Sequence, residues 1–111
     1  MGNIDNYTFL CMVDELKESE GKRMYINDVD IAVFKFNEEI FVFGNICPHQ
    51  QAPAIHEGFV ENGCVVCPLH GWTFNLKDGK LHNGGKGLDT FQIKIIRGEL
   101  HAKVSAKNIN W

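Results

Sequence analysis

Two short clusters of cysteine and histidine lie in the middle of this 111-residue sequence. Positions 47–49 read Cys-Pro-His, and after seventeen further residues positions 67–70 read Cys-Pro-Leu-His. Thiolates and imidazoles bind zinc and the irons of iron–sulfur clusters. The two ligands of each cluster are so close in sequence that one tight loop can turn both toward one centre, and the proline limits the freedom of that loop. The pattern predicts a metal site with four ligands: Cys47, His49, Cys67 and His70.

The spacing of the two clusters resembles the signature of Rieske proteins, in which two cysteines hold one iron of a [2Fe-2S] cluster and two histidines hold the other. The resemblance implies that Cys47 and Cys67 bind the buried iron. His49 and His70 would then bind the outer iron through a ring nitrogen. The similarity extends over most of the chain and is to the soluble Rieske ferredoxins and to the small subunit of assimilatory nitrite reductase.

This resemblance also implies an architecture. It indicates an all-β chain, folded as an antiparallel sandwich or barrel with a cluster-binding subdomain inserted at one end. The whole of residues 1–111 would form a single Rieske domain, with a base from about residues 1–44 and 77–111 and the subdomain at about 45–76. Strand count alone would also allow an SH3-like or OB barrel, which the metal loops disfavour.

A structural zinc site is the alternative for the same four side chains, since two cysteines and two histidines are also a zinc-binding set. Zinc sites often use a cysteine pair spaced like Cys64 and Cys67. However, Cys64 follows Asn62-Gly63, a strong hairpin signal, and should therefore begin a strand. Residues three apart in a strand face opposite sides, so we expect Cys64 to be a buried thiol and not a ligand.

Composition indicates one globular domain in solution. Hydrophobic residues make up 44% of the chain and charged residues 23%, which argues against disorder and membrane insertion. A net charge of -3, without a run of Lys or Arg, argues against nucleic acid as a partner. The N-terminus shows no basic segment followed by an apolar one, so we expect a cytoplasmic protein in which Cys11 and Cys64 stay reduced and pack in the core.

Strand-forming runs and turn signals account for most of the remaining sequence. We expect one helical turn near residues 13–16 and a glycine-rich mobile loop at residues 83–87. Turns are predicted at residues 27–28, 37–39, 62–63, 77–80 and 97–99. The predicted strands are Tyr7–Cys11, Arg23–Ile26, Val29–Phe36, Ile40–Phe43, Phe59–Val60, Cys64–Val66, Phe91–Ile96 and Leu100–Val104, and residues 72–74 lead out of the second loop.

Several residues near the clusters carry weaker expectations. The remaining histidines, His56, His82 and His101, have no partner at ligand spacing and should be exposed or hydrogen-bonded imidazoles. Trp72 should pack beneath the second loop, with contact to a redox partner as the alternative. Backbone N–H groups around residues 50–52 and 69–71, including that of Gly71, are expected to donate hydrogen bonds to the cluster sulfurs.

The sequence contains no arrangement suited to catalysis. No carboxylate pair is placed for acid–base chemistry, and no glycine-rich dinucleotide fingerprint is present. We therefore predict an electron-transfer protein that catalyses nothing alone. The resemblance implies a monomeric one-electron carrier, with a flavin-dependent NAD(P)H reductase as donor, an oxygenase or other oxidoreductase as acceptor, and neither nucleic acid nor membrane as a partner.

Two other roles follow from the same resemblance. The chain could be the fixed small subunit of an assimilatory NAD(P)H nitrite reductase. Many members of that group lack the cluster ligands, whereas all four are present here, which favours the carrier. We do not expect a catalytic oxygenase subunit, because it needs a second domain with an iron site and 41 residues follow His70 in this sequence.

Absent residues predict a low reduction potential. Rieske proteins of the respiratory type carry a disulfide between their two loops, and the matching positions here are Ala52 and Leu69. That type also has a hydroxyl side chain two positions after the second histidine, where this chain has Trp72. Fewer donors leave the reduced cluster less stabilised, so we expect a midpoint of roughly 0 mV or below, toward the low end of the family's range of about -150 to +300 mV.

Overall fold

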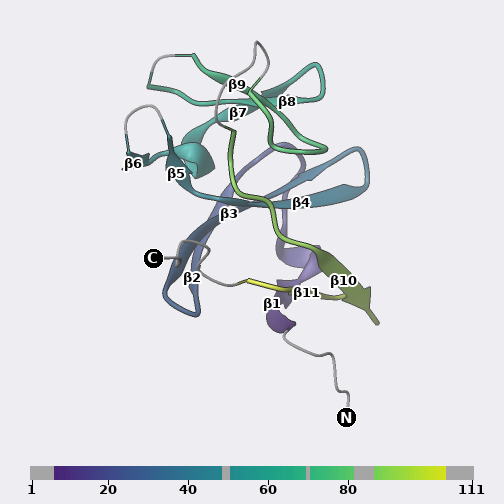
Figure 1. Ribbon diagram of the computed structural model, residues 1–111. Coiled ribbons are helices and arrows are strands. Elements are labelled where there is room, and N and C mark those ends of the chain that lie inside the picture. The colour runs from purple at the N-terminus through teal and green to yellow at the C-terminus, as the bar shows by residue number, and fades with distance from the viewer. Residues whose placement is uncertain (1–6, 49–50, 70, 82–86, 105–111) are drawn as a thin grey trace.

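The computed structural model describes residues 7–48, 51–69, 71–81 and 87–104, and their regular secondary structure is almost entirely β-strand (Figure 1). Two short 3-10 helices are present in them, η1 (Val13–Glu15) and η2 (Ile55–Glu57). The strands are β1 (Thr8–Met12), β2 (Lys22–Ile26), β3 (Val29–Phe36), β4 (Glu39–Gly44), β5 (Ile46–Cys47), β6 (Ala52–Pro53), β7 (Phe59–Glu61), β8 (Cys64–Val66), β9 (Thr73–Asn75), β10 (Ile93–Ile96) and β11 (Glu99–Ala102). The all-β prediction is confirmed.

Two-residue turns connect the hairpins that the sequence predicts. Asn27 and Asp28 join β2 to β3 with φ of 53° and 67°, and Asn62 and Gly63 join β7 to β8 with φ of 52° and 77°. Positive φ at both central residues matches the right-handed twist of the flanking strands, and Asn, Asp and Gly accept that conformation most readily. The turns after β3 and β10 are shorter than predicted, because Glu39 and Glu99 already pair within strands.

A central antiparallel sheet of β2, β3 and β4 has both of its faces covered (Figure 1). Along β3, Ile31 and Val33 pack on one face, against side chains of the sheet β1-β11-β10. Ala32 and Phe34 alternate to the opposite face and pack toward the sheet β7-β8-β9. Successive strand residues point to opposite sides, so this one strand links two separate hydrophobic clusters.

The second of these clusters carries the region of interest. It contains Phe43 of β4, Val65 of β8, Phe74 of β9 and both cysteines of the predicted metal site. The small sheet of β5 and β6 leads directly out of β4 at the same end of the molecule. The described part of the chain has no helix long and apolar enough to cross a membrane. The predicted loop at residues 83–87 lies almost wholly outside the described residues.

Candidate metal centre

Cys47 and Cys67 lie at the inner end of two loops and belong to one buried cluster. Cys47 ends β5 and Cys67 follows β8, and each residue is only 1% exposed. The same cluster contains the aromatic side chains of Phe34 in β3, Phe43 in β4 and Phe74 in β9. Segments twenty residues apart in sequence therefore place their thiols in one apolar environment, as the prediction of two cysteine ligands for a buried iron requires.

The two loops share one backbone design. Gln51 donates its backbone N–H to the carbonyl oxygen of Cys47 at 2.6 Å, and Gly71 donates its own to the carbonyl oxygen of Cys67 at 3.0 Å. In both loops the donor is the fourth residue after the cysteine and has positive φ, 56° at Gln51 and 72° at Gly71. Glycine adopts that conformation without strain, which explains its presence in the second loop. The Gly71 N–H, expected to reach a sulfur, donates to this carbonyl instead.

The closing residue of each loop also pairs with the cysteine. Cys47 pairs with Ala52 in the β5–β6 ladder, and Cys67 donates its backbone N–H to the carbonyl oxygen of Trp72 at 2.8 Å. Each cysteine is thus tied to the residue five positions later. In each loop, the hydrogen bond to the cysteine carbonyl and the pairing with the fifth residue leave only three residues for the loop tip, so the loop conformation is tightly constrained.

The predicted histidine ligands, His49 and His70, lie outside the described residues. For this reason no group of three or more metal-binding side chains is found among the residues that are described. The two described donors fit an iron–sulfur cluster, since both are thiols held at the buried side of the loops, and a thiolate is the ligand that such a cluster requires.

The other two cysteines occupy the structural positions expected of them. Cys64 is 8% exposed, and its thiol donates to Oδ1 of Asn75 at 3.6 Å. It is not a member of the buried cluster that contains Cys67, which confirms the prediction of a buried thiol facing away. Cys11 packs in the cluster on the other side of the central sheet, where burial and, to a lesser degree, the charge of Glu15 raise the pKa of its thiol.

Trp72 and two of the remaining histidines have packing or hydrogen-bonding roles. Trp72 is partly buried and packs against the cluster that holds both cysteines, as the packing interpretation predicts. His101 has its Nε2 3.2 Å from a carboxylate oxygen of Glu99, and Nδ1 of His56 lies 3.2 Å from Oδ1 of Asn45. Both are hydrogen-bonded imidazoles, as expected. His82 lies outside the described residues.

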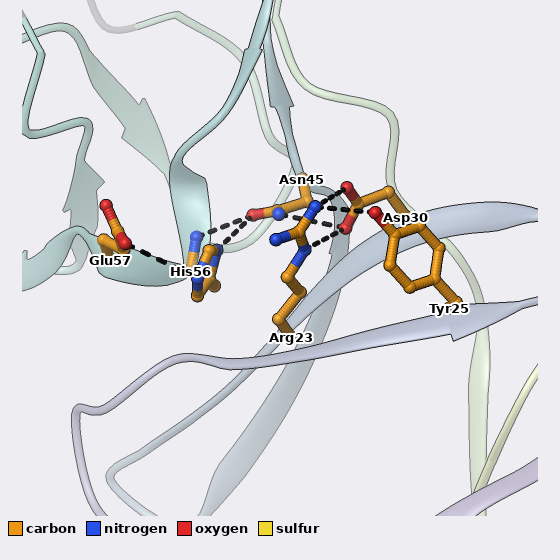
Figure 2. Close-up of polar contacts among 6 residues, drawn as sticks. All are labelled: Arg23, Tyr25, Asp30, Asn45, His56 and Glu57. Atoms are coloured by element: carbon orange, nitrogen blue, oxygen red, sulfur yellow. Dashed lines mark hydrogen bonds and ion pairs between the residues drawn. The ribbon is translucent and has the colours of Figure 1, made fainter.

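A polar network beside the first loop was not predicted from the sequence (Figure 2). Its centre is Asn45, which is 0% exposed and is the buried polar residue of the described chain. The Asn45 side chain donates from Nδ2 to Oδ1 of Asp30 at 3.0 Å. Its Oδ1 accepts the backbone N–H of His56 at 2.7 Å. The network therefore connects β3, the start of the first loop and helix η2.

Arg23 fixes the carboxylate of Asp30 from the other side. It donates from Nε to Oδ1 at 3.0 Å and from Nη2 to Oδ2 at 2.7 Å, and Nη2 also reaches the hydroxyl of Tyr25 at 2.7 Å. Burial alone would raise the pKa of the Asp30 carboxyl, but the hydrogen bonds from Arg23 and Asn45 outweigh it and hold that pKa below its usual value. Asp30 is therefore an acceptor for both neighbours at neutral pH.

One signal in the sequence could have revealed the Arg23–Asp30 pair of this network. The two-residue turn at Asn27-Asp28 fixes the hairpin register, with Tyr25 opposite Asp30. Arg23 is then diagonal to Asp30 across the hairpin, within reach of a long side chain. The role of Asn45 had no such signal, because its partners His56 and Asp30 come from segments whose approach depends on the tertiary fold.

Comparison with known proteins gives a consistent group of relatives. The model of the Rieske [2Fe-2S] domain matches residues 6–92. The anthranilate 1,2-dioxygenase ferredoxin subunit of Burkholderia cepacia is 32% identical over 97 residues, with 86% of this chain and 89% of that one covered. The 3-phenylpropionate/cinnamic acid dioxygenase ferredoxin subunit of Photorhabdus laumondii is 35% identical over 100 residues, with 87% and 93% covered.

A solved structure extends the similarity to the fold. It is of a protein described as an NADH-dependent nitrite reductase small subunit from Mycobacterium tuberculosis, and it superposes with a TM-score of 0.82. The two chains are 21% identical, and the match covers 90% of this chain and 96% of the other. Identity at this level supports a common fold and says nothing of a common partner.

Cys64, which begins β8, and Cys67, which directly follows β8, allow a direct test of the site. Replacing Cys67 with Ser should abolish the visible absorption of a bound iron–sulfur cluster, because a thiolate ligand is lost. The matched control, Cys64→Ser, should retain it, since that hydroxyl can still donate to Asn75. Absorption and iron analysis of both purified variants provide the measurement. Loss of the cluster in a folded Cys64→Ser protein would contradict the assignment.

Proposed function

Because the chain belongs to the Rieske family of [2Fe-2S] domains, we propose that it is a one-electron carrier that passes electrons from a reductase to a terminal oxygenase. The chain binds a [2Fe-2S] cluster, and it serves electron transfer without being an enzyme itself. Cluster binding is supported most by the pair of equally buried thiols, Cys47 and Cys67, in two loops of matching backbone design, and the carrier role by the identity to ferredoxin subunits.

The proposed ligands divide the cluster site into a buried and an outer side. Cys47 and Cys67 would hold the inner iron, while His49 and His70 would hold the outer one. When bound, the cluster accepts and releases one electron. Leu69, the neighbour of His70, is 44% exposed, and Pro68 is exposed as well. An outer iron beside exposed loop residues suits brief contact with a partner over a small area.

The proposed partners follow from the relatives. Two relatives above 30% identity are ferredoxin subunits of dioxygenases, which favours an oxygenase as the acceptor. The proposed donor is a flavin-dependent reductase that takes two electrons from NADH or NADPH and passes them on one at a time. We further propose a cytoplasmic monomer, with residues 45–76 as the cluster-binding subdomain and residues 1–44 and 77–111 as its base.

The alternative is the small subunit of an assimilatory NAD(P)H nitrite reductase. It is favoured by the structural similarity to the Mycobacterium tuberculosis protein. In that case the same cluster would relay electrons inside a permanent complex, or would serve a structural role there. The higher sequence identity lies with the ferredoxin subunits, so the carrier is the leading proposal.

Isolation from its native cells distinguishes the two roles. A carrier should purify as a monomer whose cluster is reduced by a separately added reductase in the presence of NADH, since transfer complexes are short-lived. Size-exclusion chromatography with a spectroscopic reduction assay provides the measurement. A stable complex with one large subunit in fixed stoichiometry would contradict the carrier and support the nitrite reductase role.

A low reduction potential is part of the proposal. Respiratory Rieske proteins tie their loops with a disulfide, and here the matching positions hold Ala52 in β6 and an exposed Leu69. Trp72 stands where those proteins have a hydroxyl side chain, and it packs partly buried. Without that hydroxyl, the negative charge added on reduction has one fewer donor to stabilise it, which makes reduction harder.

The expected midpoint potential is therefore roughly 0 mV or lower, in the bottom part of the range of about -150 to +300 mV. Such a value allows electrons to arrive from a reduced nicotinamide through a flavin. Mediated electrochemical titration of the purified protein at neutral pH measures it. A midpoint above about +150 mV, in the upper part of the same range, would remove the thermodynamic support for this role.

A further inference from the structure

The structure assigns to Asn45 the role of a positioning residue for the first cluster loop. We propose that its side chain and backbone hold the two ends of the segment 46–54, which carries Cys47, in fixed register with β3, and that this register sets the geometry and retention of the cluster. The inference rests on the proposed function only in taking Cys47 as a cluster ligand.

Every hydrogen-bonding group of Asn45 has a partner across the base of the loop. Its backbone N–H donates to the carbonyl oxygen of Asp30 at 2.9 Å, and its backbone carbonyl accepts from the N–H of Ile55 at 3.2 Å. Its side chain donates to the Asp30 carboxylate and accepts from the His56 N–H. One residue thus connects the start of the loop, its end at residues 55–56, and β3.

Burial makes these bonds hard to replace. Asn45 is completely inaccessible to solvent, so water cannot take over from a lost protein partner. Removing the Asn45 amide would leave the partly buried N–H of His56 without this acceptor, which is destabilising. The chain around helix η2 is also closely packed, since a Cβ on Gly21 would lie 2.3 Å from the His56 carbonyl oxygen. The loop end therefore has little room to shift.

The residues that orient the Asn45 side chain lie outside the loop. Asp30 lies in β3, and Arg23 of β2 donates two hydrogen bonds to its carboxylate (Figure 2). The Asp30 side chain is 11% exposed, and its position is fixed by the hairpin on which both residues stand. The orientation of the Asn45 amide is therefore dictated by a rigid element of the fold, as expected of a group that orients a metal-binding loop.

The path from Asn45 to the cluster is short. Cys47 is two residues further on, and the intervening Ile46 pairs directly with Pro53 at the other end of the loop. A shift of the loop base would move the Cys47 thiol and the neighbouring backbone N–H groups relative to the second loop. Ligand orientation and hydrogen bonding around the cluster determine its electronic properties and its retention.

The test uses cluster-loaded protein and two readouts other than electron-transfer activity. The first is the rate at which an iron chelator removes the cluster, and the second is the set of EPR g values of the reduced cluster. Asn45→Ala should release iron faster than wild type, by about 10- to 100-fold if the rate follows the loss of metal affinity that accompanies removal of a group orienting a metal ligand. Its g values should also shift.

A second substitution of Asn45 and an unrelated core variant extend the test. Asn45→Asp keeps an acceptor for the His56 N–H but places a second carboxylate against Asp30, so it should also release iron faster than wild type. Val33→Ala lowers stability from the hydrophobic cluster on the other face of the central sheet and should leave both readouts at wild-type values.

The outcomes separate this inference from the proposed function. Wild-type release and g values in Asn45→Ala, or equal changes in Val33→Ala, would overturn the positioning role alone. If Asn45→Ala does not fold, Asp30→Ala decides, because it removes the acceptor of the Asn45 side-chain N–H: faster release supports the role and an unchanged rate overturns it. A wild-type protein without a Rieske EPR signal would overturn the ligand assignment and, with it, this inference.

Discussion

The buried hydrophobic cluster beneath Cys47 and Cys67 is the constraint on which the rest of the structure depends. The two thiols come from separate loops, and a shared metal cluster requires a fixed distance between them. Phe34 and Phe43 from the central sheet and Phe74 from β9 belong to the same buried cluster as both thiols. Because protein interiors are closely packed, a shift of either loop base would disturb the packing of this cluster.

The backbone hydrogen bonds of the two loops also restrict the position of the proposed ligands, Cys47 and Cys67. In both loops a hydrogen bond returns from the fourth residue to the cysteine carbonyl, and backbone pairing joins the cysteine to the fifth. The first loop has a further attachment through Asn45 to Asp30 and helix η2. A rigid site suits electron transfer, since little rearrangement is needed when one electron arrives or leaves.

Much of the strand and turn arrangement could be predicted from local sequence. The hairpins follow from turn pairs such as Asn27-Asp28 and Asn62-Gly63, whose backbone preferences are local. The strand that begins at Cys64 explained why this residue faces away from Cys67, and the structure confirms it. The ligand set containing His49 and His70 stays a prediction, because those two residues are not among the ones described.

The features that sequence could not reveal depend on tertiary contacts. Asn45 looks like an ordinary residue between a strand and a loop, and only the folded chain brings His56 and Asp30 to its amide. The destination of the Gly71 N–H was predicted wrongly for a similar reason. A residue with positive φ four positions after a cysteine returns its donor to the cysteine carbonyl, and the spacing of ligands does not indicate that turn.

We propose that two thiols hold the inner iron of the cluster and that two imidazoles hold the outer one. Pulsed EPR on the reduced protein, produced with natural and with ¹⁵N-labelled histidine, tests this most directly. We expect two strongly coupled nitrogens whose signals change to those of ¹⁵N in the labelled protein. A reduced [2Fe-2S] cluster without coupled histidine nitrogens, or with only one, would contradict the account.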